Sequence, residues 1–370
     1  MLPPLLPRMR RAALRIRASA ANLGLDAQPG SLFLVTGGGG WSVTEIALGL
    51  RPHLTPHFRE ASILDQVDQR PYLSRANVHC LCRPAFFKGG GIPPLHSSNR
   101  LVVSWLHGGR QSDSPEIVAA CRQLERHWRR VGRIVVPNTR TLRDVLDCGV
   151  DEGIVRVIPT AVDTRLFQPC TNPDCRLEVR RRFGIPLDAF VVGSFQRDED
   201  DAGMPKLVKG PDVLVEALAS VRRQAPVHVL LTGPSRRYVT QGLESHGVPH
   251  TYVQQGALAD MSHMYHALDA YCVSSREEGG PAPLRESMAS GVPVVSTRVG
   301  LAIDLIDHGR NGFVADVGDA SGLARDLLAL AADAATGRRV AAAASETVRA
   351  LDFSVIAQRL RAEVYSGAFG

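Results

Sequence analysis

Glu278 and Glu286 enclose a glycine- and proline-containing segment that could bind a phosphate and a sugar together. The segment follows a short apolar run, contains Gly279 and Gly280, and enters a predicted helix that ends at Gly291. The first turn of a helix has N–H groups without intrahelical partners and the positive end of the dipole, so it favours phosphate. Carboxylates accept strong hydrogen bonds from hydroxyl groups, so Glu278 could bind a sugar beside that phosphate and Glu286 a ribose beyond it.

This segment has the pattern of a strand, a loop, a helix and a second strand. The apolar runs 270–273 and 292–295 are the predicted strands. Pro281 suits the first helical turn, because its missing N–H is not needed there. The backbone N–H groups of residues 281–284 are the predicted donors to the phosphate.

A glycine-rich loop and a histidine mark two further strand ends. The run 31–36 is followed by four glycines, residues 37–40, and a helix-like stretch, which is a Rossmann-type turn that lets a backbone approach a ligand closely. Its spacing is not G-x-G-x-x-G, which disfavours NAD. His107 follows the run 101–106, and open α/β sheets bind ligands beyond such strand ends. The alternatives are a tight turn without a ligand and a structural histidine.

Three basic residues follow the predicted strand 189–195: Arg197, Lys206 and Lys209. Fixed cations beside a diphosphate stabilise the negative charge that grows as it leaves. Taken singly, each of these three residues is expected to be a solvated loop charge. The acidic run 198–201 (DEDD) could hold magnesium or manganese, but it stands between basic residues, so we predict that it is solvated and that no metal is bound.

The spacing Glu278-x7-Glu286 and the continuation SMASGVPVVSTRVG resemble the E-x7-E signature of retaining, nucleotide-sugar-dependent glycosyltransferases of family 4. The segment 155–169, VRVIPTAVDTRLFQP, is similar to the crossover between the two domains of that family, although Thr160 and Ala161 replace the usual Asn and Gly. The resemblance spans about residue 31 to the end of the chain.

This resemblance implies the α/β GT-B architecture, in which two Rossmann-like domains face each other across a cleft. The second domain would bind the NDP-sugar donor, and the first would bind the acceptor. In this family the leaving phosphate takes the acceptor proton, so the resemblance implies no side-chain nucleophile, no cofactor and no metal.

The resemblance also assigns roles to residues. His107 and Glu278 would contact the donor sugar, and Glu286 the ribose. Arg197 and Lys209 would bind the leaving diphosphate; Arg197 is the nearest substitute for a basic residue that the family has at the position of Ser194. The remaining donor-binding candidates are Gly279, Gly280, Pro281, Ala282, Pro283, Leu284, Lys206, Gly38 and Gly39.

The length of 370 residues predicts two domains rather than one core. We expect four parts: a basic helix or arm over 1–30, an acceptor domain over 31–168, a nucleotide-sugar domain over 169–348 and a C-terminal helix over 349–370 that crosses back to the first domain.

The net charge of +6 is concentrated at the start of the chain. Residues 1–30 contain five arginines and one aspartate, which leaves +4 there and a nearly neutral remainder. This distribution argues against a nucleic-acid partner. The first 30 residues could form a basic amphipathic helix that lies on an anionic membrane surface, or a helix that packs on its own domain.

The seven cysteines are scattered and odd in number, so we predict reduced thiols and a cytoplasmic protein. No apolar run approaches the roughly 20 residues that span a bilayer.

The predicted function is retaining transfer of a sugar from an NDP-sugar to an acceptor hydroxyl on a small molecule, a glycan or a lipid-linked sugar. The alternatives are a nucleotide-sugar epimerase on the same fold and a non-catalytic nucleotide-sugar-binding protein. The motifs do not distinguish among uridine, guanosine and adenosine donors.

Overall fold

The computed structural model describes residues 30–38, 41–66, 76–83, 98–172, 174–200, 202–254 and 258–366. They form two compact units: the first contains the described residues up to Ala161 and those from Phe353 onward, and the second is Val162–Asp352. The chain passes between the units after residues 161 and 352, whereas the sequence places these boundaries after residues 168 and 348. Residues 1–29 of the expected helix or arm lie outside the described residues.

The first unit is built on a six-stranded parallel sheet with the strand order β2-β1-β3-β4-β5-β6. Its strands are β1 (Ser31–Val35), β2 (Glu60–Leu64), β3 (Ala76–Cys80), β4 (Arg100–Ser104), β5 (Arg133–Val136) and β6 (Val155–Val157). Every residue of β1 is buried, as expected for a parallel strand with helices on both faces.

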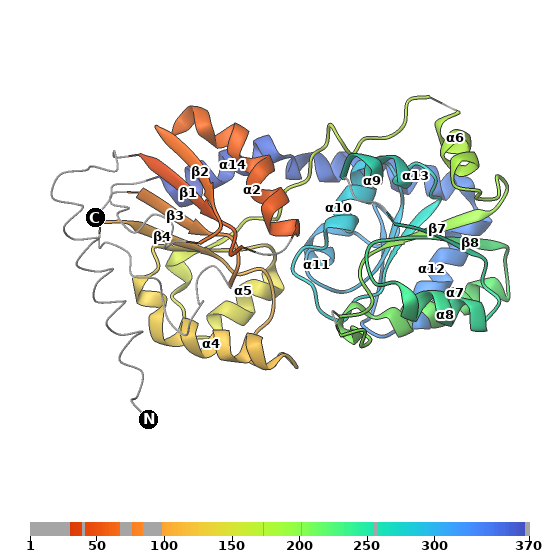
Figure 1. Cartoon of the computed structure of the whole chain (residues 1–370), viewed down its shortest axis with the longest axis horizontal. Coiled ribbons are helices and arrows are strands. Elements are labelled where there is room, and N and C mark those ends of the chain that lie inside the picture. The colour runs from red at the N-terminus through yellow and green to blue at the C-terminus, as the bar shows by residue number, and fades with distance from the viewer. Residues whose placement is uncertain are drawn as a thin grey trace. The chain divides into compact units, whose positions relative to one another are not determined.

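Helices cover both faces of this sheet (Figure 1). They are α2 (Trp41–Leu54), α4 (Pro115–His127), α5 (Thr139–Leu146) and α14 (Phe353–Leu360), which continues as a π-helical turn at Arg361–Tyr365. Helices α2 and α14 pack on one another where Gly49 leaves room for the ring of Phe353. The last helix of the chain therefore belongs to the first unit.

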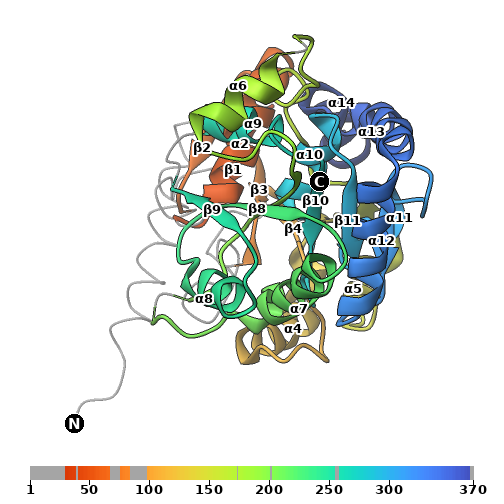
Figure 2. The same ribbon diagram turned by 90° about the vertical axis from the view of Figure 1, so that its right-hand side faces the viewer.

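The second unit also has a six-stranded parallel sheet, with the order β12-β11-β10-β7-β8-β9. Its strands are β7 (Phe190–Phe195), β8 (Val227–Thr232), β9 (His250–Val253), β10 (Ala270–Val273), β11 (Val294–Thr297) and β12 (Phe313–Ala315). Its helices are α6 (Cys175–Arg182), α7 (Pro211–Arg222), α8 (Arg237–Ser245), α9 (Leu258–Tyr265), α10 (Ala282–Ala289), α11 (Ala302–Leu305), α12 (Ala320–Ala332) and α13 (Ala334–Val348). Helices α7, α8 and α12 lie over one face of the sheet (Figure 2).

Within the second unit, this order is that of a Rossmann fold: the unit's first strand, β7, lies beside its fourth, β10. The chain runs outward in opposite directions from this pair. Ligands of such sheets bind beyond the carboxyl ends of the strands at this switch point. The loops that follow β7 and β10 are therefore the place to look for a site. The predicted fold class, α/β with two Rossmann-like domains, is confirmed.

Helix α9 spans Leu258–Tyr265, because a turn closed by the Leu268 N–H and the Tyr265 carbonyl ends it before β10. Strand β2 and helix α8 were not predicted. Among the described residues, no helix is both long enough and apolar enough to cross a bilayer.

The prediction that every cysteine is reduced is wrong for Cys170 and Cys175, which form a disulfide. Their Cα atoms are 6.5 Å apart, which is within the range that a disulfide bridges. The other five cysteines are free thiols, as predicted, and all of them are buried: Cys80, Cys82, Cys121, Cys148 and Cys272.

Candidate active site

Lys209 and Glu278 meet at the switch point of the second sheet. Lys209 ends the loop after β7, and Glu278 lies in the loop after β10. The Lys209 Nζ donates to Glu278 Oε1 at 2.5 Å, and the Ser275 hydroxyl donates to the same oxygen at 3.0 Å. The lysine and glutamate side chains are 26% and 13% exposed, so solvent or a ligand reaches them. The structure thus brings together two residues that the sequence assigned to one ligand.

The backbone around Lys209 is tied to the end of β10. Gly210 has φ +60°, and a Cβ at this position would collide with the Ser274 carbonyl oxygen. The Lys209 carbonyl oxygen accepts hydrogen bonds from the Ser274 hydroxyl (3.2 Å) and the Gln196 amide (3.1 Å). Only glycine allows this approach, which sets where the Lys209 side chain begins.

The start of α10 offers fewer phosphate donors than predicted. Pro281 is the N-cap rather than the first helical residue, and neither Pro281 nor Pro283 has an N–H. The Leu284 N–H donates to the Pro281 carbonyl oxygen at 3.2 Å. The expectation that all of residues 281–284 donate to phosphate is therefore wrong at these three positions, and Ala282 is the remaining donor of that set. Gly291 lies just past the helix with φ +71°, as predicted.

The backbone of Glu278 and Gly279 packs closely against a second glycine, Gly300. A Cβ at Gly300 would lie 2.5 Å from the Gly279 carbonyl oxygen and 2.6 Å from that of Glu278. The Thr297 hydroxyl donates to the Ser275 carbonyl oxygen at 2.6 Å. The loop that carries Glu278 is thus packed against the loop after β11.

Glu286 is buried inside α10, with 7% of the residue exposed. The Tyr265 hydroxyl donates to Glu286 Oε2 at 2.7 Å, and the neighbouring Arg285 is also buried. Burial raises the pKa of the Glu286 carboxyl, while the Tyr265 hydrogen bond and the Arg285 charge oppose this rise. The proposed ribose contact is a prediction that this geometry does not test.

Tyr265 is a residue that sequence analysis missed. Its ring packs edge-on against Phe195 and Phe167, with centroid distances of 4.9 and 5.7 Å. The nearby Tyr271 hydroxyl accepts a hydrogen bond from the Phe195 N–H at 2.7 Å. Nothing in the local sequence links the end of α9 to a carboxylate 21 residues later.

Arg236, from the loop after β8, contacts Ser194. The Arg236 guanidinium donates to the Ser194 hydroxyl at 3.1 Å and to the Gln196 carbonyl oxygen. It also lies 3.3 Å from a carboxylate oxygen of Asp198, and both side chains are buried. Arg236 therefore holds the loop after β7 from inside the domain, away from solvent.

The prediction that the run 198–201 is solvated is wrong for its first two residues. Asp198 accepts the Val239 N–H at 2.8 Å, and Glu199 pairs with Arg237 at 3.1 Å. Burial raises the pKa of Asp198, and the Arg236 charge opposes this rise. These acids fasten the loop to the start of α8. Asp200 is exposed, as predicted.

Arg197 and Lys206 lie half-buried in the same loop. The Lys206 N–H donates to the Asp198 carbonyl oxygen at 2.8 Å, which ties Lys206 to the first residue of the acidic run. Their assignments to the diphosphate stay predictions.

The first unit contains the remaining candidates. His107 is half-buried and follows β4; its carbonyl oxygen accepts a hydrogen bond from Arg83. Gly38 follows β1 with φ +68°, and a Cβ there would lie 2.9 Å from the Gln66 amide nitrogen. Gly39 lies outside the described residues. The roles of His107 and Gly38 stay predictions.

Comparisons with known proteins agree with this architecture. Residues 202–333 match the family model described as glycosyl transferases group 1. The chain is 31% identical over 212 residues to D-inositol 3-phosphate glycosyltransferase of Xylanimonas cellulosilytica, which covers 54% of this chain and 48% of that protein. It is 29% identical over 246 residues to mannosylfructose-phosphate synthase of Agrobacterium fabrum, covering 61% and 52%. The chain thus spans about half the length of these relatives.

A solved structure, Anabaena HepE in complex with UDP-glucose, has the same fold, with a TM-score of 0.71 at 18% identity over 91% of this chain and all of that one. The family model covers the loop from residue 202 to Lys209, the whole of α10 and both glutamates. Residues 202–333 are thus similar to the glycosyl transferases group 1 family, and the two Rossmann-like domains have the GT-B fold.

Proposed function

We propose that this protein is a retaining glycosyltransferase that moves a sugar from an NDP-sugar to an acceptor hydroxyl without a metal ion. The observation that carries the proposal is the Lys209–Glu278 pair at the switch point of the second sheet, inside the segment that matches the family. A uridine nucleotide is the first donor to test, because Anabaena HepE was solved with UDP-glucose.

The pair supplies the two kinds of contact that a nucleotide-sugar needs. Glu278 would accept hydrogen bonds from sugar hydroxyls, and Lys209 would meet the diphosphate oxygens. In the described structure Lys209 and Glu278 neutralise each other. When the donor binds, each side chain would replace the other with a donor group, so neither charge would be left without a partner. As the glycosidic bond breaks, negative charge grows on the leaving oxygen, and a lysine already in place stabilises it.

The proposed reaction needs no side-chain nucleophile and no side-chain base. In front-face transfer the leaving phosphate accepts the acceptor proton, so the acceptor oxygen attacks on the face from which the phosphate departs and the configuration is retained. Lys209 and the Ala282 N–H would share the diphosphate charge. Glu286, held by Tyr265, would accept from the ribose hydroxyls.

Acceptors should be phosphorylated polyols and sugars in the first instance, because both relatives named above carry a phosphorylated sugar or cyclitol in their names. Glycans and lipid-linked sugars complete the panel. A cytoplasmic location and peripheral membrane contact through residues 1–30 belong to the same proposal and rest on the sequence alone.

The test is product analysis by mass spectrometry and NMR with a panel of NDP-sugars, with and without acceptors. The proposal expects an acceptor-dependent product whose anomeric configuration equals that of the donor, formed equally well in EDTA. An inverted product, a sugar epimer formed without an acceptor, or a product that needs added magnesium or manganese would contradict it.

A further inference from the structure

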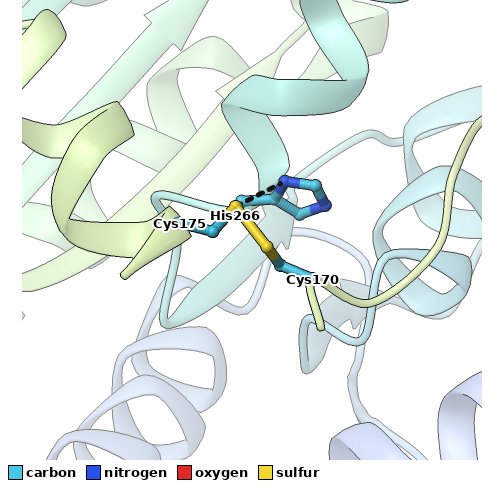
Figure 3. Close-up of side chains that lie close together, drawn as sticks. All are labelled: Cys170, Cys175 and His266. Carbon is cyan, nitrogen blue, oxygen red and sulfur yellow. Dashed lines mark hydrogen bonds between the residues drawn. A yellow bond between two sulfur atoms is a disulfide. The ribbon is translucent and has the colours of Figure 1, made fainter. Parts of the chain in front are cut away.

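Two cysteines and a histidine converge at the beginning of the second unit, in residues that the proposed transfer does not use. Cys170 lies in the exposed loop before α6, Cys175 is the first residue of α6, and His266 directly follows α9. One ligand atom from each, the two Sγ atoms and a histidine ring nitrogen, lie within 4.8 Å of one another (Figure 3). Two sulfurs and an imidazole are ligands that zinc prefers.

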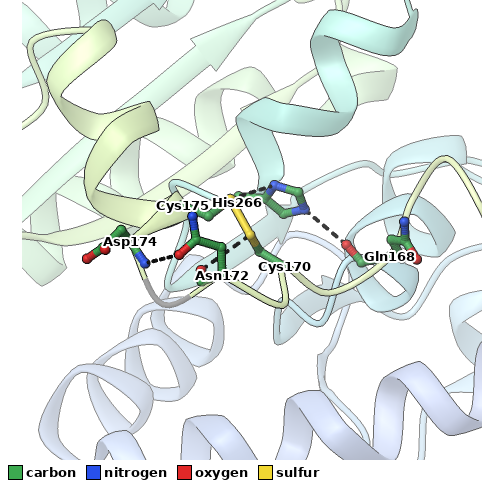
Figure 4. Close-up of a disulfide and its surroundings, with 6 residues drawn as sticks. All are labelled: Gln168, Cys170, Asn172, Asp174, Cys175 and His266. Carbon is green, nitrogen blue, oxygen red and sulfur yellow. Dashed lines mark hydrogen bonds between the residues drawn. A yellow bond between two sulfur atoms is a disulfide. The ribbon is translucent and has the colours of Figure 1, made fainter.

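The hydrogen bonds of His266 orient its other nitrogen towards the sulfurs. Its Nε2 lies 3.0 Å from the Gln168 carbonyl oxygen, which only accepts, so Nε2 carries the proton (Figure 4). In the neutral ring Nδ1 then has a free lone pair, and Nδ1 lies 3.3 Å from Cys175 Sγ. A backbone carbonyl that fixes the tautomer in this way is the usual outer partner of a metal-binding histidine.

The disulfide provides no hydrogen-bond donor for the His266 Nδ1 lone pair. The sulfurs of the Cys170–Cys175 disulfide have no proton to donate to the Nδ1 lone pair. After reduction, the same three atoms would be two thiolates and one imidazole lone pair. Cys175 stands at the N-terminus of α6, where the helix dipole favours a thiolate.

We propose that reduced Cys170 and Cys175 bind Zn²⁺ together with His266, and that the disulfide is the oxidised, metal-free state of the same three residues. A dithiol or phosphine reductant breaks the S–S bond; the bond takes up two electrons and two protons, and the reductant is oxidised. Zinc then displaces the two thiol protons to solvent and forms two Zn–S bonds and one Zn–N bond. Water takes the fourth position.

The site would hold the first segment of the second unit against the end of α9. Pro169 already packs against Gly291 just past α10, and Phe167 packs on Tyr265. Zinc would add a constraint one residue from Tyr265, which binds Glu286. The metal is thus a structural clamp and takes no part in glycosyl transfer.

The test is zinc content of the full chain. The protein is reduced with a phosphine, mixed with Zn²⁺, passed over a chelating resin and analysed by plasma mass spectrometry. We expect one zinc per chain after reduction and none after oxidation with diamide. Replacing zinc with Co²⁺ should give thiolate-to-cobalt absorption.

Three variants and one matched control decide the ligands. Cys170→Ser, Cys175→Ser and His266→Gln should each lower zinc affinity at least tenfold. His263→Gln changes an exposed histidine on α9, three residues before His266, and should bind zinc as the wild type does. Cys170 is exposed, so Cys170→Ser keeps the test valid if another variant fails to fold.

Zinc retained by the oxidised protein, or retained equally by Cys170→Ser and His266→Gln, would overturn the proposal. So would loss of zinc in His263→Gln to the same extent. None of these readouts depends on glycosyl transfer, so the zinc site and the proposed enzyme activity can fail separately.

Discussion

At the scale of single residues, Lys209 and Glu278 neutralise each other across 2.5 Å in the described structure. The proposed role of Lys209 grows during the reaction, because its partner changes from a carboxylate to a diphosphate that gains charge. An interaction that is stronger in the transition state than in the ground state raises turnover more than affinity. Lys209 should therefore matter more for kcat than for donor binding.

Lys209→Ala is expected to lower kcat by a factor of roughly 100–1,000, the usual cost of losing one preorganised charge stabiliser. Lys206→Ala, in the same loop, is the control and should change kcat little. Steady-state kinetics at saturating donor compare the two. Normal turnover in Lys209→Ala would remove this lysine from the reaction, and a large loss in Lys206→Ala would transfer the role to its neighbour.

Glu286→Gln should weaken donor binding without weakening the fold. Burial raises the pKa of Glu286 above its unfolded value, so the folded state holds the proton more tightly than the unfolded state. Stability then falls as pH rises from the unfolded pKa through the folded pKa, because the buried carboxyl loses its proton there at a desolvation cost. A neutral glutamine avoids it.

Calorimetry should show a melting temperature for Glu286→Gln at pH 7 that equals or exceeds that of the wild type, and a loss of donor affinity of about 1–3 kcal/mol. Wild-type donor affinity in Glu286→Gln would exclude the ribose role.

Tyr265→Phe removes the hydrogen bond that favours the charged Glu286 carboxylate. As the pH is lowered, donor binding by this variant should therefore weaken at a higher pH than donor binding by the wild type.

At the scale of elements, the site depends on how closely the loops after β7 and β10 approach. Gly210 and Gly247 have nearly the same positive φ, +60° and +62°, but only Gly210 faces backbone, while Gly247 has nothing within 4 Å. The pair therefore separates the cost of backbone strain from the cost of displacing a loop.

Gly247→Ala is expected to cost about 1 kcal/mol of unfolding free energy, from strain alone. Gly210→Ala should cost more than that and should also reduce kcat, because the collision with Ser274 moves Lys209. Urea denaturation and kinetics on both variants provide the comparison. Equal effects of the two changes would mean that the loop contact does not position the lysine.

The acidic run joins the loop after β7 to the start of α8. Asp198→Ala leaves Arg236 buried without its carboxylate, and breaking a buried pair in this way costs about 3–5 kcal/mol. Asp200→Ala, two residues away and exposed, loses only hydrogen bonds to the Ala202 and Met204 N–H groups and should cost about 1 kcal/mol. Thermal unfolding that ranks the two in the opposite order would contradict the structural role of Asp198.

At the scale of the whole molecule, the net positive charge is concentrated at the start of the sequence. Five arginines lie between residues 8 and 17, outside the described residues, and no catalytic candidate lies there. Removing residues 1–25 should leave kcat on a soluble acceptor nearly unchanged and should lower binding to anionic vesicles at low salt. Co-sedimentation checks this. If the full chain does not bind such vesicles, the membrane role of this arm is excluded.

The sequence alone determined the fold class and the places where chemistry could occur. Short apolar runs that end in glycine or small polar residues predicted β1, β7 and β10, because strand formation and loop conformation depend on local pattern. The E-x7-E spacing placed two glutamates around the start of α10 for the same reason.

Only the tertiary structure decided which residues meet. Lys209 and Glu278 are 69 residues apart, and their ion pair exists because β7 and β10 are neighbours in the sheet. Burial of Asp198 depends on Arg236 from the next strand's loop, so its charge looks solvated in the sequence. Tyr265 meets Glu286, and the segment with Cys170 and Cys175 meets His266, through packing of separate elements. The fold sets these contacts, and no local sequence pattern predicts them.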